Sequence, residues 1–150
     1  MERPQAIMRT YPETPRPAVG AVVFKGDAVL LVRRGHPPGR GLWAIPGGTV
    51  HLGETLQAAA EREILEETGV VIRARDPVLA FDVIERDRRG GVKYHYVIVD
   101  LVGDYVSGEP RAGSDASDAR WIRPAELARL AVNSATRRLL SEKFNFGKWA

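Results

Sequence analysis

The chain has 150 residues, of which 44% are hydrophobic and 27% charged, which predicts one globular domain with one sizeable core. It contains no cysteine, which excludes disulfides, zinc–thiolate sites and cysteine nucleophiles. The formal net charge is +3 without a run of five or more basic residues, a balance that suits a small anionic ligand such as a nucleotide better than nucleic acid.

The first residues of the chain are polar and dotted with proline. We expect residues 1–16 to form an extended N-terminal arm that precedes a single domain over residues 17–150. The arm has no apolar core of the kind found in signal peptides, and no apolar run in the chain is long enough to span a membrane. We therefore expect a cytoplasmic protein without a membrane partner.

Two short apolar runs predict a β-hairpin at the start of the domain. The strands are Ala18–Phe24 and Ala28–Arg34, and the turn between them contains Gly26. The glycines and prolines of Gly35–Gly41 predict a loop. A short strand is expected at Thr49–Leu52.

A helix is expected to follow this strand. Thr55 is a good N-cap, and Gly69 marks the residue just beyond the last helical turn. At ~100° of rotation per residue, the apolar side chains at the start of the helix fall on one stripe. This stripe consists of Leu56, Ala59 and Ala60.

Three glutamates continue this apolar stripe. With the direction of Leu56 set as zero, Glu63 falls at roughly −20°, Glu67 at roughly +20° and Glu66 at roughly −80° around the helix axis. Charges on a packing face are costly, and spacing of i, i+3 and i+4 makes these carboxylates repel one another. The cluster therefore needs cations, and Mg²⁺ prefers such oxygen ligands. The alternative, a solvated helix face, is disfavoured because its glutamates would lie opposite the stripe.

The second half of the chain alternates strands and loops. The expected strands are Val70–Arg73, Val78–Ile84, Val92–Val102 and Asp118–Ile122. A break near Asp76 and Pro77 is expected to separate the first two strands. Glu85–Gly91 is expected to be a charged hairpin loop. Gly103–Ser117 is rich in glycine and acidic residues and is expected to be a long loop.

Two helices are expected at the end of the chain. Pro124 suits the first helical position, with Ala125–Leu130 inside that helix, and Asn133 suits the N-cap of a helix from Ser134 to about Lys143. An aromatic tail would dock on the core rather than on a partner subunit in a homodimer; it consists of Phe144, Phe146 and Trp149. The element order predicts a mixed α+β domain with helices on the faces of a mostly antiparallel sheet.

The stretch from Gly48 to Val70 resembles the Nudix box, the signature of the Nudix hydrolases. Every fixed position is present: Gly48, Glu54, Arg62, Glu63, Ile64, Glu66, Glu67, Gly69 and Val70. A chance match is on the order of one in a billion per window at average residue usage. The resemblance implies an α/β/α sandwich with a central mixed, largely antiparallel sheet.

The same resemblance implies a metal site. It implies that Glu63 and Glu67 are direct ligands of Mg²⁺, for which Mn²⁺ is a substitute, and that Glu66 is a further ligand. The carbonyl of Gly47, just before the box, is implied as a backbone ligand. Divalent ions would neutralise the charge of a pyrophosphate that otherwise repels a nucleophile.

Several arginines are implied to position the site or to hold phosphate. Glu54 and Arg62 resemble the pair that holds the box loop against the helix, a role that suits the planar guanidinium. Arg33 and Arg34 end a strand near the box and, with Arg40, could bind a phosphate bidentately. The alternative for each strand-end arginine is a side chain that simply reaches solvent.

The general base stays open between two sources. It is either Glu66 or another glutamate of the box, or it is an acid from the loop before the last strand. That loop offers Glu109, Asp115 and Asp118, of which we favour Asp115 because Asp118 is close to the following strand.

The substrate is implied by a softer resemblance. The strand around Tyr94 and the glycine-rich loop after it look most like small bacterial ADP-ribose pyrophosphatases. This implies hydrolysis of ADP-ribose to AMP and ribose 5-phosphate, with Tyr94 stacking on base or ribose unless it only packs in the sheet. The alternatives are a pyrophosphohydrolase of nucleoside triphosphates and a non-catalytic nucleotide sensor.

The chain departs from its relatives at one variable position of the box. His51 stands where many relatives carry an acid, so the resemblance does not carry that acid's role over to this chain.

Overall fold

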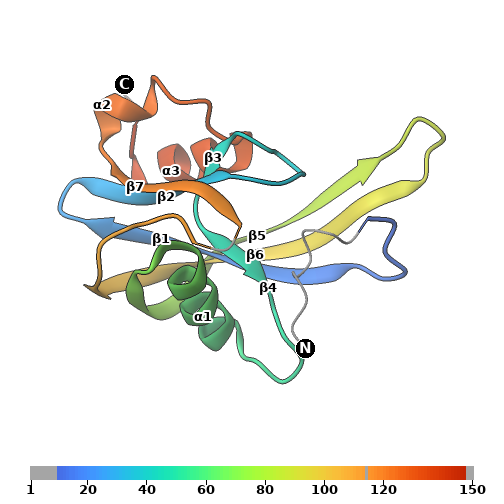
Figure 1. Ribbon diagram of the computed structural model, residues 1–150, viewed down its shortest axis with the longest axis horizontal. Coiled ribbons are helices and arrows are strands. Elements are labelled where there is room, and N and C mark those ends of the chain that lie inside the picture. Colours follow the sequence, from blue (N-terminus) through green and yellow to red (C-terminus); the bar gives the residue numbers. More distant parts are fainter. Residues whose placement is uncertain (1–9, 114, 148–150) are drawn as a thin grey trace.

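The computed structural model describes residues 10–113 and 115–147. A seven-stranded mixed sheet lies between helix α1 on one face and helices α2 and α3 on the other (Figure 1). Its elements are β1 Arg16–Lys25, β2 Ala28–Arg34, β3 Trp43–Ala44, β4 Gly47–Thr49, α1 Leu56–Thr68, β5 Val71–Arg86, β6 Val92–Ser107, β7 Ala116–Ile122, α2 Pro124–Leu127 and α3 Ser134–Phe144. The expected α/β/α sandwich is confirmed.

Strand β1 is the centre of the sheet. The order is β3-β2-β1-β6-β5, with β4 also paired to β1 and β7 to β2. The predicted β1–β2 hairpin is confirmed, and β1 runs parallel to β6 and antiparallel to its other partners. In this register Gly20 of β1 lies opposite Gly47 of β4 on one side and Asp100 of β6 on the other. Segments far apart in the sequence therefore meet at Gly20.

Helix α1 begins and ends as its sequence predicts. The Thr55 hydroxyl accepts a hydrogen bond from the Ala58 N–H at 3.0 Å, which caps the N-terminus. Gly69 has a φ of 76°, a left-handed conformation that favours glycine, and its N–H bonds the Leu65 carbonyl. These caps fix the helical phase of the three glutamates between them.

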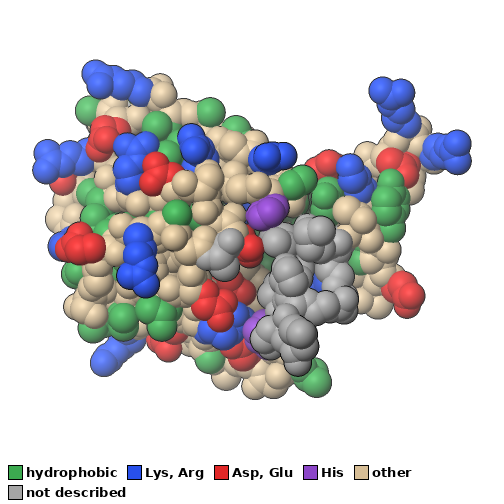
Figure 2. Space-filling view, in the orientation of Figure 1, with side chains coloured by type: hydrophobic (Ala, Val, Ile, Leu, Met, Phe, Trp, Pro, Cys, Tyr) green, Lys and Arg blue, Asp and Glu red, His purple; other side chains and the backbone are tan. Residues whose placement is uncertain are grey.

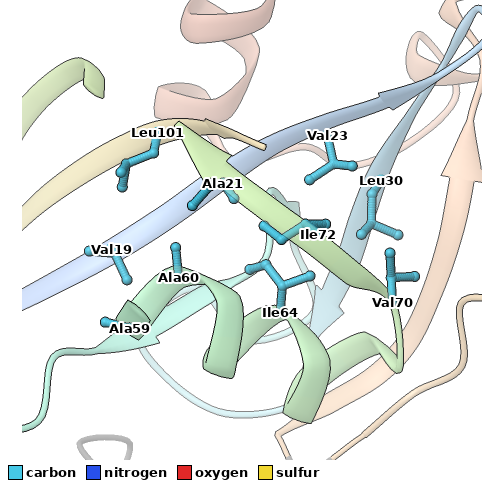
Figure 3. Close-up of a cluster of buried hydrophobic side chains, with 11 residues drawn as sticks. Val19, Ala21, Val23, Leu30, Ala59, Ala60, Ile64, Val70, Ile72 and Leu101 are labelled. Atoms are coloured by element: carbon cyan, nitrogen blue, oxygen red, sulfur yellow. The ribbon is translucent and has the colours of Figure 1, made fainter. Parts of the chain in front are cut away.

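The apolar face of α1 packs on the sheet. Figure 3 shows Ala60 and Ile64 between the helix and strands β1 and β5. The buried cluster consists of Val19, Ala21, Val23, Leu30, Ala59, Ala60, Ile64, Val70, Ile72, Ala74 and Leu101. Because Glu63 and Glu67 share the helix with these side chains, tight packing of the cluster holds them in place.

A second core lies on the opposite face of the sheet, under α2 and α3. The aromatic tail contributes to it, since the rings of Phe144 and Phe146 lie 5.3 and 5.7 Å from that of Phe24. Intramolecular docking is therefore confirmed for these two residues. Trp149 lies outside the described residues. The predicted N-cap of α3 is confirmed, because the Asn133 side chain accepts from the N–H of Ala135 at 2.9 Å.

Two predictions for the second half of the chain are wrong. Strand β5 runs unbroken past Pro77, because register shifts on either side of this residue let the ladder pass a proline that cannot donate. Strand β6 continues through Gly103 to Ser107 instead of ending in a loop. Ile72 fills the space that a Cβ at Gly103 would need, so this glycine serves packing rather than a turn.

Smaller corrections concern the element ends. The short strand of the box is Gly47–Thr49 rather than Thr49–Leu52, and α2 ends at Leu127. Strand β1 begins at Arg16, one residue before the expected domain boundary. Just before it, the Tyr11 N–H donates to the Lys93 carbonyl at 2.8 Å, which ties this part of the expected arm to the sheet. Residues 1–9 lie outside the described residues.

The outer half of the β5–β6 hairpin extends away from the body of the molecule (Figure 1). We call residues 80–98 the hairpin arm. Arm residues Phe81 and Tyr96 line a pocket at the point where the arm leaves the body. No helix formed by the described residues is long and apolar enough to cross a membrane.

Candidate active site

Two glycines bring the backbone of β4 against the carboxylates of α1. The Gly47 N–H donates to Glu67 Oε1 at 2.9 Å. A Cβ on Gly47 would overlap the backbone carbonyl of Val19, and a Cβ on Gly48 would overlap the carboxyl group of Glu63. The absence of a side chain at Gly47 therefore lets β4 approach β1, and its absence at Gly48 leaves room for the Glu63 carboxyl group.

The three glutamates differ in exposure. The side chains of Glu63 and Glu67 are 9% or less exposed, whereas that of Glu66 is 50% exposed. Burial raises the pKa of Glu67 to about 8, against the lowering effects of the Gly47 N–H and of Arg34. Burial also raises the pKa of Glu63, against Arg62. Both buried carboxylates are therefore short of positive charge.

Arg62 connects the box loop to the helix. Its Nε donates to Glu54 Oε2 at 2.6 Å, and its Nη2 donates to the Thr49 carbonyl at 3.0 Å. Its Nη1 lies 3.0 Å from Glu63 Oε2 and 3.2 Å from Glu66 Oε1. The bond from Arg62 lowers the pKa of Glu54 to about 2. This geometry is that of the predicted brace, and its part in catalysis stays a prediction.

A pocket of about 350 Å³ opens beside the buried carboxylates. Five of the predicted site residues line it: Arg34, Gly47, Glu63, Glu67 and Asp115. The charge of Asp115 contributes to the raised pKa of both Glu63 and Glu67, so this loop acid lies within electrostatic range of the box. Its backbone carbonyl accepts the Gly35 N–H at 3.0 Å, which joins the two loops at the pocket mouth.

The remaining predicted residues do not line the pocket. Glu54, Arg62 and Glu66 form the network behind Glu63. The Arg33 Nε donates to Ser117 Oγ at 2.8 Å, and Arg40 is exposed. Tyr94 is buried against Tyr96, with ring centroids 6.5 Å apart, and it is Tyr96 that lines the pocket. Substrate contacts by Arg33, Arg40 and Tyr94 stay predictions.

Sequence reasoning missed several polar residues of the pocket, among them Asp100, Asn133 and Thr136. Asp100 on β6 is 4% exposed, and burial raises its pKa to about 7. Asn133 and Thr136, at the start of α3, also line the pocket, although Asn133 was predicted only as a cap. The available signal for Asp100 was a single acid inside the otherwise apolar run Val97–Val102.

The donor set fits a hard divalent cation, although no group of three or more His, Asp or Glu side chains within the described ranges is arranged as a metal site. Among residues 10–113 and 115–147, the Glu67 side chain has one hydrogen bond, from Gly47, and the Glu63 side chain bonds only Arg62. Their raised pKa values reflect a need for further positive charge, which a cation in the adjoining pocket would meet. Figure 2 shows acidic and basic side chains next to one another over α1.

Comparison with known proteins agrees with this geometry. The model of the NUDIX domain family matches residues 14–143. An ADP-ribose pyrophosphatase of Methanocaldococcus jannaschii is 35% identical over 119 residues, covering 79% of this chain and 68% of the relative. The nucleoside triphosphatase NudI of Escherichia fergusonii is 35% identical over 137 residues, covering 85% of this chain and 96% of the relative.

A solved structure shows the same architecture. The MutT NUDIX hydrolase of Burkholderia pseudomallei superposes with a TM-score of 0.73 at 31% identity, covering 86% of this chain and 98% of that protein. The family match extends over most of the chain, and it includes both the box and the loop of Asp115. The chain therefore belongs to the NUDIX domain family, and it is a Nudix hydrolase.

Proposed function

We propose that the protein hydrolyses the pyrophosphate bond of a nucleoside diphosphate linked to another moiety, with ADP-ribose as the best candidate. The products would be AMP and ribose 5-phosphate. The observation that carries this proposal is the pair of buried carboxylates, Glu63 and Glu67, at one end of the pocket. The similarity to an ADP-ribose pyrophosphatase supports the choice of substrate.

The box residues would hold the metal. Glu63, Glu67 and the Gly47 carbonyl would bind Mg²⁺, with Glu66 as a further ligand, and the same oxygen donors suit Mn²⁺. When bound, divalent ions supply charge neutralisation at the pyrophosphate and help to activate the attacking water. Arg62 would then keep Glu63 and Glu66 in position from behind.

Two residues that line the pocket would bind the substrate phosphate and accept the proton of the attacking water. Arg34 lines the pocket and would bind a phosphate oxygen of the substrate. The water oxygen attacks a phosphorus, the bond from that phosphorus to the bridging oxygen breaks, and a carboxylate accepts the water's proton. Asp115 is our choice for this base because it lines the pocket, whereas Glu66 is half exposed outside it.

The alternative is a pyrophosphohydrolase of nucleoside triphosphates. The similarity to NudI, which extends over 96% of that enzyme, favours it. A non-catalytic sensor is less favoured, because all three box glutamates are present. A cytoplasmic location and a homodimer stay predictions. We propose no nucleic-acid partner, since the chain has no run of five or more basic residues.

A substrate panel separates these candidates. The protein would be incubated with Mg²⁺ and either ADP-ribose or each nucleoside triphosphate, and the products identified by chromatography. We expect ADP-ribose to yield AMP and ribose 5-phosphate, with kcat/KM at least tenfold above that for any triphosphate. Release of pyrophosphate from triphosphates while ADP-ribose stays intact would establish the alternative.

A further inference from the structure

Asp100 occupies a recess in the middle of the sheet. Its register partners are Gly20 on β1 and Leu79 on β5, so one neighbour has no side chain and the other is apolar. A Cβ on Gly20 would lie 2.5 Å from Asp100 Oδ1 and 3.0 Å from Ile45 Cδ1. The absence of a side chain at Gly20 therefore leaves room for the Asp100 carboxyl group beneath Ile45.

This carboxyl group faces the pocket without a protein partner. In the part of the chain that the structure describes, no hydrogen bond or ion pair involves the Asp100 side chain. Burial accordingly raises its pKa, and no neighbouring group opposes that effect. Buried polar groups are nearly always hydrogen-bonded, and an unpaired one is costly. The missing partner is expected to be a ligand.

The pocket walls on this side suit a flat apolar group. Ile98 lies two residues before Asp100 on the same face of β6, and it pairs with Phe81 of β5. Both residues line the pocket, as does Tyr96. The box carboxylates Glu63 and Glu67 line the same pocket but come from α1. A nucleotide could thus place its phosphates at the box and its base against this apolar wall.

Two other polar side chains that line the pocket, both at the start of α3, already have partners. Asn133 Oδ1 accepts the N–H groups of Ala135 and Thr136, at 2.9 and 3.1 Å. The Thr136 hydroxyl accepts the Ile45 N–H at 3.3 Å. In contrast to these two side chains, the Asp100 carboxyl group is left free to accept from a bound base.

We propose that Asp100 determines base specificity by accepting a hydrogen bond from an exocyclic amino group, so that amino-bearing bases such as adenine are preferred to their keto counterparts. The inference rests on the proposed function and adds to it the part of the substrate that is recognised. Once Asp100 is ionised, a keto oxygen at the same place would face an acceptor, which leaves both groups unpaired, so the two bases are compared at a pH above the raised pKa of Asp100.

The test uses substrates that differ in this one group. We would measure kcat/KM for ADP-ribose and for its hypoxanthine counterpart, in which a carbonyl replaces the amino group. We expect the wild-type protein to prefer ADP-ribose at least tenfold. The asparagine amide in Asp100→Asn can turn to donate or to accept, so the preference is expected to fall below about threefold. The change should come from a lower kcat/KM for ADP-ribose rather than from a higher kcat/KM for the hypoxanthine counterpart.

Asp104→Asn is the matched control. Asp104 lies on the same strand, is exposed, and pairs with Arg75 at 2.8 Å outside the pocket. This variant should keep the wild-type preference. A wild-type ratio near one would overturn the inference. So would an equal loss on both substrates in Asp100→Asn, which would instead mark a role in the chemical step.

Binding of the products separates this inference from the proposed function. Calorimetry with AMP and with IMP requires no turnover, and it needs only the wild-type protein if a variant fails to fold. The inference is supported if the wild-type protein binds AMP more tightly than IMP and if this difference is lost in Asp100→Asn or in a second variant, Asp100→Ser. This result would support base recognition even if no substrate were hydrolysed. Equal binding of AMP and IMP would contradict it even if ADP-ribose were cleaved.

Discussion

The buried acids of the pocket, Glu63, Glu67 and Asp100, hold their protons more tightly than acids in water because the fold removes them from solvent. Glu67 and Asp100 have pKa values raised to about 8 and about 7, both chiefly by burial. Glu54 shows the opposite shift, to about 2, because Arg62 donates to it directly. A carboxyl group with a raised pKa destabilises the fold when it ionises, so we propose that these acids serve function rather than stability.

Asp100 should therefore make stability depend on pH. Its unfolded pKa is 3.8 and its folded pKa about 7, so the native state binds the extra proton and stability falls as pH rises through this range. The wild-type free energy of unfolding should drop between pH 5 and pH 8 by on the order of 2 kcal/mol more than that of Asp100→Asn. Urea titrations at both pH values measure this difference, and parallel curves for the two proteins would contradict it.

Arg62 should be irreplaceable by lysine. Lysine keeps the charge, but its three N–H donors share one nitrogen and cannot replace the five hydrogen bonds of the planar guanidinium to Glu54, Glu63, Glu66 and the Thr49 carbonyl. We expect Arg62→Lys to lose about 1–3 kcal/mol of stability in chemical denaturation and to lower kcat. Arg73→Lys, an exposed site on β5, should change stability by less than about 0.5 kcal/mol. Equal stabilities of the two variants would contradict the claim that Arg62 holds the box loop against helix α1.

At the scale of elements, β4 and α1 meet through two glycines with different neighbours. The space beside Gly47 is filled by the backbone of Val19, which cannot move without breaking the pairing of β1 and β4. The space beside Gly48 is filled by the side chain of Glu63, which can rotate away. One glycine therefore serves the fold, and the other serves the position of a carboxylate.

Alanine substitutions should separate these two roles. Gly47→Ala is expected to lose more than about 2 kcal/mol of stability. Gly48→Ala should remain folded, with a melting temperature within a few degrees of wild type, but its turnover should fall at least tenfold because Glu63 is displaced. Thermal melts and rates with ADP-ribose test the pair. Full activity of Gly48→Ala would show that the position of Glu63 does not matter.

The elements that sequence predicted well are those set by local rules. The caps Thr55, Gly69 and Asn133 and the phase of the glutamates on α1 follow from nearest-neighbour geometry, and the structure confirms them. Glu66, placed at roughly −80° on the helix, is indeed half exposed. The continuation of β6 through Gly103 depends on Ile72 of another strand, so no local signal could predict it.

At the scale of the whole molecule, the site depends on long-range pairing. The parallel pairing of β1 with β6 brings Asp100 beside Gly20, and the antiparallel pairing of β1 with β4 brings Gly47 to the other side. Periodicity along one strand carries no information about which strands become neighbours. Sequence therefore identified the half of the site that the box supplies, but it missed the half of the pocket to which Asp100 belongs.

The most direct test of the account is the turnover of ADP-ribose with Mg²⁺ by Glu67→Gln. This variant removes a charge from the buried pair but little volume, so it should stay folded and lose more than about a hundredfold in kcat. Glu61→Gln, on the same helix but bonded to the Ala74 N–H, should keep wild-type turnover because an amide oxygen still accepts that bond. Turnover by folded Glu67→Gln within about threefold of wild type would contradict the assignment of the buried carboxylates as the metal site.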